Sequence, residues 1–149
     1  MKRLHIHLGV RDLIQSIDFY TQLFNSKPNR VEEDYAKWQL QNPPLNFAIS
    51  NRHDKPGVHH LGLEFDDTQA LQNHRNRLAS VFKAEAMLAE EAVECCYAVS
   101  DKYWLGDPQG VRWEQFATLR EVDSRACCAP EAENASQCCA QTPQNACCE

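Results

Sequence analysis

Hydrophobic and polar residues alternate over the first segment of the chain, residues 4–10, where two histidines separate apolar side chains. This period of two predicts a β-strand. Apolar residues then recur at helical spacing over 13–24, directly after Asp12, which is a good N-cap residue, so an α-helix is predicted there. Two more strands are predicted at 35–40 and 45–50, around a turn rich in proline.

The same order of patterns returns in the second half of the chain. Residues 58–65 read as a strand, Asp67 as a second N-cap, and 71–82 as a weaker amphipathic helix. Three further strands are predicted, at 84–90, 95–100 and 111–117.

The two halves superimpose with an offset of 55 positions, which places His5 on His60 and Asp12 on Asp67. Such self-similarity predicts a duplicated βαβββ unit. The expected fold class is α+β, with paired modules at about 1–50 and 58–120. The polar segment 51–57 serves as the linker between them.

Composition changes near residue 120. Residues 121–149 carry one arginine against five acids, six cysteines, and Val122 as the only larger aliphatic residue. This segment cannot bury enough apolar surface to offset the entropy lost on ordering. We therefore expect one domain over 1–120 and a disordered, thiol-rich tail over 121–149.

The length and the net charge of the chain argue against some classes of function. The chain has 149 residues, about one domain, and a net charge of −6, which argues against nucleic-acid binding. No apolar run reaches the roughly 18 residues that a membrane span needs, and the start lacks the cleavage site of a signal peptide. A cytoplasmic protein without nucleic-acid or membrane partners is expected.

His5 and His60 occupy matching strand positions, so both imidazoles can reach one point if the two strands face each other. Glu114 lies among apolar residues in the last predicted strand, where an ionised carboxylate needs a partner such as a cation. Two histidines and one carboxylate suit non-haem Fe(II) sites that activate oxygen, and zinc would accept them too. His7 and His59 are alternative ligands, and a purely structural role for these histidines is the competing interpretation.

The eight cysteines occur only as adjacent pairs, which predicts binding of a soft species such as trivalent arsenic, Cd(II), Zn(II) or Cu(I). The pairs are Cys95-Cys96, Cys127-Cys128, Cys138-Cys139 and Cys147-Cys148. Adjacent residues of a regular strand point to opposite faces, so the first pair can chelate one ion only at a bulge, a strand end or a loop. One buried and one exposed cysteine is the alternative.

A family resemblance rests on His5, on the segment 58–64 (VHHLGLE) and on 106–114 (GDPQGVRWE). These motifs resemble the vicinal oxygen chelate superfamily, which includes glyoxalase I, bleomycin- and fosfomycin-resistance proteins and extradiol dioxygenases. The resemblance covers 1–120 and implies two paired βαβββ modules around a metal cleft.

Within that superfamily the chain is similar to the carbon–arsenic lyases, through 19–25 (FYTQLFN), 43–45 (PPL), 60–62 (HLG) and 95–102 (CCYAVSDK). Cadmium-induced proteins share much of this pattern. The resemblance implies that His5, His60 and Glu114 bind the metal and that Cys95 and Cys96 bind arsenic. A glyoxalase-type site would need a fourth ligand from 45–50, which offers Asn46 but no carboxylate or histidine.

The expected function is that of an Fe(II)-dependent dioxygenase that cleaves the carbon–arsenic bond of methylarsenite or aromatic arsenicals with O2, leaving inorganic arsenite. Ni(II), Mn(II) and Zn(II) are alternative metals. Glu114 is the expected catalytic residue, and the tail thiols are accessory arsenic or metal ligands. The alternatives are a protein that sequesters arsenic or cadmium and a glyoxalase-like metalloenzyme. A homodimer is left open, because such modules can also swap between chains.

The sequence allows two locations for three aromatic side chains near the first cysteine pair, the substrate pocket or the core. These residues are Tyr97, Tyr103 and Trp104.

Overall fold

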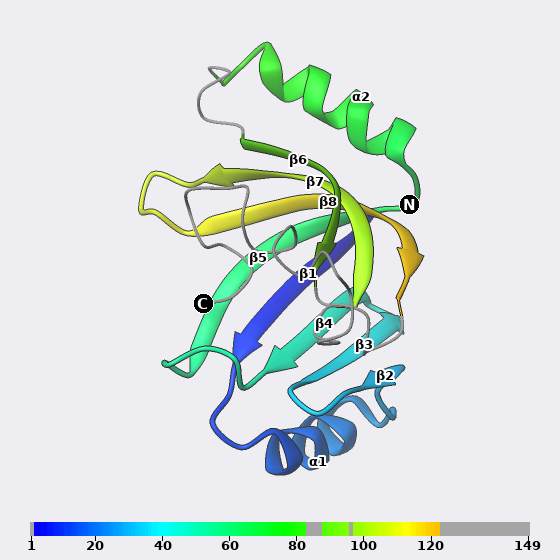
Figure 1. Ribbon diagram of the computed structural model, residues 1–149, viewed down its shortest axis with the longest axis vertical. Coiled ribbons are helices and arrows are strands. Elements are labelled where there is room, and N and C mark those ends of the chain that lie inside the picture. Colours follow the sequence, from blue (N-terminus) through cyan, green and yellow to red (C-terminus); the bar gives the residue numbers. More distant parts are fainter. Residues whose placement is uncertain (1, 83–87, 96, 123–149) are drawn as a thin grey trace, which may run out of the picture.

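The computed structural model describes residues 2–82, 88–95 and 97–122, with the side chains of 88–95 left out. Its eight strands form one curved sheet in the order β2-β3-β4-β1-β5-β8-β7-β6, and Figure 1 shows the two helices at opposite ends of it. The strands are β1 (Lys2–Gly9), β2 (Arg30–Val31), β3 (Tyr35–Gln41), β4 (Pro44–Ser50), β5 (Gly57–Phe65), β6 (Leu88–Cys95), β7 (Ala98–Gly106) and β8 (Arg112–Glu121); the helices are α1 (Leu13–Phe24) and α2 (Thr68–Ala79).

The sheet order is symmetric about its centre and confirms the duplicated βαβββ unit. β1 pairs antiparallel with β5, and each of them pairs parallel with the last strand of its own module, β4 or β8. The helices begin 55 positions apart, each after an aspartate whose side chain accepts a backbone N–H of the first turn: Asp12 from Gln15 and Asp67 from Ala70. These caps satisfy N–H groups that a helix start leaves unpaired.

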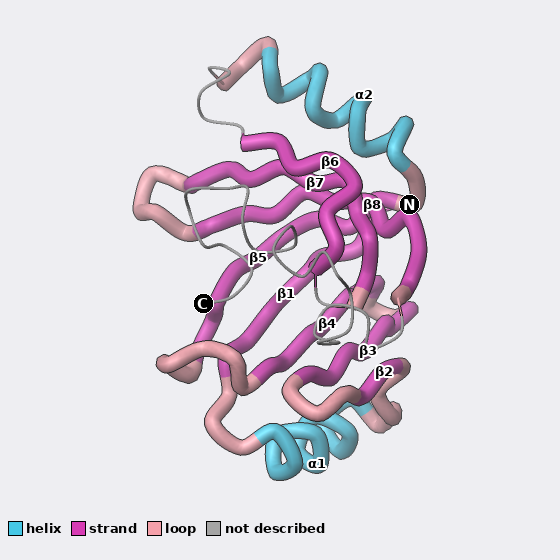
Figure 2. The backbone as a smooth tube through the Cα atoms, in the orientation of Figure 1, coloured by secondary structure: helices cyan, strands magenta, loops and turns pink. Residues whose placement is uncertain are grey.

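Each module has its own apolar core between its helix and one face of the sheet (Figure 2). The first core consists of Leu13, Ala36, Trp38, Phe47 and Ile49, and the second of Phe65, Leu71, Leu78, Tyr103 and Ala117. Ile6 lies opposite Leu61 and Leu4 opposite Leu63 in the central pair, so both cores use the same face. The alternate residues of β1 and β5, which include His5, His7 and His60, point to the other face.

Several predicted boundaries in the second module were wrong. The helix ends at Ala79, and Val81 and Phe82 are exposed beyond it. The strands predicted at 84–90 and 95–100 are β6 and β7, displaced so that Cys95 ends one strand and Ala98, its partner in the register, begins the next. Cys95 therefore ends a strand and does not begin one.

The last strand runs beyond residue 117 to Glu121, and Val122 after it is buried. The two-residue strand β2 was not predicted, because it is too short to show a period. The six tail cysteines, Cys96 and most of the predicted tail lie outside the described residues. None of the helices in the described part of the chain is both long and apolar enough to cross a membrane.

Candidate metal centre

His5, His60 and Glu114 meet on the polar face of the sheet, at its centre. They come from β1, β5 and β8, and all three are buried. His5 Nε2 lies 3.1 Å from His60 Nε2, and Glu114 Oε2 lies 3.7 Å from the first nitrogen and 3.4 Å from the second. Three residues far apart in the sequence thus turn one donor atom each toward a common point.

These separations fit a shared metal ion. Ligand atoms about 2.0–2.2 Å from one ion, at angles between octahedral and tetrahedral values, lie roughly 3–3.5 Å from one another. The observed 3.1 and 3.4 Å lie within that range, and the third separation, 3.7 Å, lies slightly above it. Two imidazoles and one carboxylate on one side of an ion leave its other positions open.

His5 is held with the correct nitrogen toward the site. Its Nδ1 lies 3.1 Å from the backbone oxygen of Asn46, and a carbonyl only accepts hydrogen bonds, so Nδ1 carries the hydrogen and Nε2 keeps its lone pair. Burial lowers the pKa of His5 to about 4. The ring is therefore neutral at pH 7, as a metal ligand must be.

His60 is oriented by a second histidine. Its Nδ1 lies 2.7 Å from Nδ1 of His59, whose ring is stacked on that of His53 at 3.6 Å between centroids. With a metal ion on Nε2 of His60, its Nδ1 would carry the hydrogen and Nδ1 of His59 would accept it. Burial, with His53 as the largest charge effect, lowers the pKa of His59 to about 4, so its lone pair is available at neutral pH.

Replacing His59 with alanine is expected to weaken metal binding about 10- to 100-fold, the usual cost of losing a partner that orients a ligand. His74→Ala is the matched control, because His74 packs against Phe65 away from the site. Titration of the reduced protein with Mn(II) in a calorimeter measures both. Equal affinities for the two variants would show that His59 does not orient His60.

Glu114 divides its two oxygens between the histidines and a lysine. Oε2 faces the imidazoles, and Oε1 lies 3.4 Å from Nζ of the buried Lys102 on β7. Burial alone would raise the pKa of Glu114, but its hydrogen bond with His60 and the charge of Lys102 outweigh that effect and hold the pKa far below its usual range. The carboxylate is ionised, as a metal ligand must be. Nothing in the sequence pattern indicates this role of Lys102.

Gly62 allows β5 to approach Glu114 closely. A Cβ built on Gly62 would lie 2.5 Å from the backbone oxygen of Glu114 and 3.2 Å from its Cβ. We expect Gly62→Ala to push β8 away from β5 and to reduce Mn(II) affinity at least about tenfold. Gly106→Ala is the control, since its added Cβ would meet nothing within 4 Å, and Mn(II) calorimetry compares them. Unchanged affinity in Gly62→Ala would contradict this account of the packing.

His7 remains close to the candidate ligands. It faces His60 directly across the β1–β5 pair, and one donor atom each from His5, His7 and His60 lies within 4.8 Å of the others. Its Nε2 lies 2.9 Å from the hydroxyl of Ser50, whereas Oε2 of Glu114 faces the Nε2 atoms of His5 and His60. The position of the Glu114 carboxylate therefore favours His5 and His60 over His7 as the metal ligands.

The first module offers no fourth ligand at the position equivalent to Glu114. Gly62 pairs with Glu114 in the second module, and His7, 55 positions earlier, pairs with Ala48 in the first. Ala48 is buried and supplies only a methyl group. Of the two equivalent positions, only the one in the second module therefore supplies a carboxylate.

The aromatic residues near the first cysteine pair divide between core and site. Tyr103 is 1% exposed and belongs to the second core. The ring of Trp104 stands edge-on against His60, 5.1 Å between centroids. Tyr97 lies in the turn that follows the pair. His53, which stacks on His59, falls in the predicted linker and has no periodic signal in the sequence.

Curated proteins resemble the chain along most of its length. A trivalent organoarsenical cleaving enzyme of Bacillus sp. (strain MD1) is 38% identical over 154 residues, covering 95% of this chain and 92% of that protein. The cadmium-induced protein CadI of Mycobacterium bovis is 32% identical over 128 residues, covering 83% and 81%. No family model matches the chain.

A solved structure supports the fold. The Mn(II)-bound glyoxalase from Novosphingobium aromaticivorans superimposes with a TM-score of 0.56 at 15% identity, covering 84% of this chain and 42% of that one. At this identity the similarity concerns the fold alone. It agrees with the duplicated βαβββ architecture that the pattern of residues predicted.

Proposed function

The chain belongs to the family of trivalent organoarsenical cleaving enzymes and cadmium-induced CadI proteins. On this basis we propose that it cleaves the carbon–arsenic bond of trivalent organoarsenicals and releases inorganic arsenite. The observation that carries the proposal is the convergence of His5, His60 and Glu114, with donor atoms 3.1–3.7 Å apart. A protein that only sequesters arsenic through thiols has no need of such a site.

In this proposal His5, His60 and Glu114 hold Fe(II), which supplies the activation of O2 that bond cleavage requires. Asn46 and His59 fix the orientation of the two imidazoles through their Nδ1 atoms. Mn(II), Ni(II) and Zn(II) are alternative occupants of the same donor set. Lys102 adds a fixed positive charge beside the carboxylate.

Cys95 and Cys96 bind the trivalent arsenic as thiolates in this proposal, and the six tail cysteines are accessory thiols. Cys95 ends β6, and a strand end is one of the places where adjacent cysteines can serve one atom. Capture by two thiolates converts the encounter of arsenical and oxygen into a reaction between positioned groups.

The reaction balances without a further reductant. Methylarsenite and O2 together contain the atoms of arsenite and formaldehyde, and the methyl carbon supplies all the electrons that reduce the oxygen. The carbon–arsenic bond breaks, a carbon–oxygen bond forms, and arsenic stays trivalent.

The test is a turnover assay on the full chain, reduced and loaded with Fe(II) under anaerobic conditions. Methylarsenite is added, O2 is admitted, and arsenite and formaldehyde are quantified. Production of both, dependent on iron and on oxygen, would support the proposal. Stoichiometric arsenical binding without arsenite, with each candidate metal, would favour sequestration instead.

A further inference from the structure

Three histidines gather near the end of β1 and the start of β5, beside the candidate metal centre. His7, His53 and His59 each offer a donor nitrogen, and these nitrogens lie within 4.8 Å of one another. The ring centroids of His53 and His59 are 3.6 Å apart, and that of His7 is 5.5 Å from each. His7 is buried, whereas His53 and His59 are half-buried. Solvent thus reaches one side of these three residues, which we call the outer histidine cluster.

A β-bulge in β5 brings His59 to the outer histidine cluster. His7 pairs with His60 across the β1–β5 seam, but the next pair joins Leu8 to Val58, so His59 is an extra residue. Neighbours in a regular strand point to opposite faces, and a bulge redirects the extra side chain. The rings of His59 and His60 lie 4.9 Å apart, and both contact that of His7. The bulge thus turns two successive histidines toward the same neighbour.

Gly9 allows the loop that carries His53 to lie against β1. A Cβ built on Gly9 would lie 2.7 Å from the backbone oxygen of Lys55 and 3.4 Å from Cβ of His53. Because real Cβ atoms essentially never approach other atoms as closely as 2.7 Å, any other residue here would push the loop away. The glycine therefore lets His53 stack on His59, with 9° between the ring planes.

The donor set of the outer histidine cluster suits zinc. Three imidazoles can bind Zn(II) with a water molecule in the fourth position, whereas Mn(II) prefers oxygen ligands. Donor atoms around one ion lie roughly 3–3.5 Å apart, so binding would draw the three rings together. It would also open the stack, because one ion cannot lie in the planes of two parallel rings 3.6 Å apart. The half-buried rings of His53 and His59 can turn to do so.

His59 connects the outer histidine cluster to the candidate metal centre. Its Nδ1 lies 2.7 Å from Nδ1 of His60, and in such a pair one nitrogen donates the hydrogen and the other accepts it. A metal ion on Nε2 of His60 requires His60 to donate. An ion on Nδ1 of His59 would take the accepting lone pair, and an ion on its Nε2 would leave the hydrogen on Nδ1. In either case His59 could no longer accept.

We propose that His7, His53 and His59 form a second metal site that takes Zn(II), and that its occupation weakens metal binding at the candidate metal centre. The second site rests on the outer histidine cluster alone. Its effect on the centre rests on the proposed function, in which His60 is a metal ligand. Because the loss of a partner that orients a ligand costs about 10- to 100-fold in metal affinity, excess zinc would inhibit the enzyme from outside its metal centre.

The first test counts zinc ions by calorimetry. The full chain is prepared with all eight cysteines replaced by serine, so that no thiol binds zinc. His53→Phe keeps an aromatic ring beside His59 but has no donor nitrogen, and His74→Ala is the matched control. His53→Phe is expected to bind one zinc ion fewer than the control, and His53→Ala should do the same. Equal stoichiometry in His53→Phe and the control would overturn the second site.

The second test measures how fast Mn(II) leaves the candidate metal centre. The same chain is loaded with one equivalent of Mn(II) and mixed with excess Zn(II), and free Mn(II) is followed by electron paramagnetic resonance. Zinc that only competes for the centre must wait for Mn(II) to leave, so the rate would equal that measured with EDTA. Zinc at the second site should raise the rate to a plateau about 10- to 100-fold above that value.

The variants separate the possible outcomes. In His53→Phe the release of Mn(II) should not depend on the zinc concentration, whereas the His74→Ala control should show the full rise. A rate that is independent of zinc in the control would overturn the coupling between the two sites. A chain that binds no Mn(II) would overturn the proposed metal centre instead, and the zinc stoichiometries would still decide whether the second site exists.

Discussion

Glu114→Gln is expected to reduce arsenite production by at least about 100-fold, more than the loss of a residue that merely orients a ligand. The substitution keeps the shape of the side chain but removes the negative charge that faces His5 and His60. Binding of methylarsenite to the thiols should persist, because the substitution leaves both cysteines in place. Turnover and calorimetric titration with the arsenical separate the two effects.

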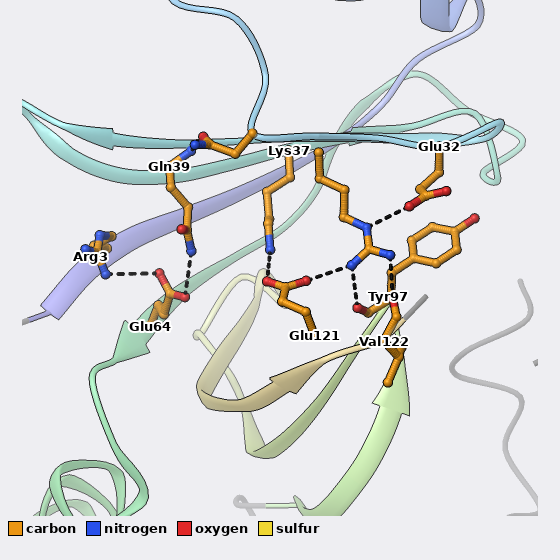
Figure 3. Close-up of polar contacts among 10 residues, drawn as sticks. Arg3, Glu32, Lys37, Gln39, Glu64, Tyr97, Glu121 and Val122 are labelled. Carbon is orange, nitrogen blue, oxygen red and sulfur yellow. Dashed lines mark hydrogen bonds and ion pairs between the residues drawn. The ribbon is translucent and has the colours of Figure 1, made fainter. Parts of the chain in front are cut away.

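Glu64→Gln is the matched control for this variant. Glu64 is a buried carboxylate on β5 that contacts Arg3 and Gln39 (Figure 3). Burial raises its pKa, so the loss of its charge should be tolerated. If Glu114→Gln and Glu64→Gln retain the same activity, Glu114 is not a metal ligand and the assignment of the site fails.

Cys95→Ser is expected to weaken methylarsenite binding by about 10²–10⁴-fold, since one thiolate cannot supply the effective concentration of a linked pair. Cys96→Ser should behave alike. Both are made in the full chain with the six tail cysteines replaced by serine, and compared with that background by arsenical titration. Mn(II) affinity should not change. Undiminished binding in either variant would remove thiol capture from the proposed function.

The sequence predicted those parts of the molecule that repeat or alternate. His5 and His60 could be matched because their strands share the offset of 55 positions that also separates Asp12 from Asp67, and the structure brings their Nε2 atoms to 3.1 Å. Glu114 stood out as an ionisable residue in an apolar strand. Local pattern and the symmetry of the fold made these residues candidates, and the family resemblance selected His5 and His60 over His7 and His59.

The supporting residues could not be found in this way. His53 contacts His59 from a polar loop, and Lys102 reaches Glu114 from a neighbouring strand; both contacts depend on tertiary structure. The boundary between β6 and β7 was misplaced because Tyr97 adopts a left-handed φ, which no property of a tyrosine side chain predicts. Its hydrogen-bond partner Asp34 belongs to the other module, and Arg52, which contacts its ring, belongs to the linker.

The separation of the two apolar cores has a thermodynamic consequence. Leu13 and its neighbours pack under β3 and β4, and Leu71 and its neighbours under β5 and β8, so neither core spans the central β1–β5 seam. An ion held by His5 on one side and by His60 and Glu114 on the other would bind only when the halves are docked. The free energy of metal binding would then stabilise the docked arrangement of the two halves, because the ion binds only that arrangement. The supply of metal in the cell would therefore set how cooperatively the two halves unfold.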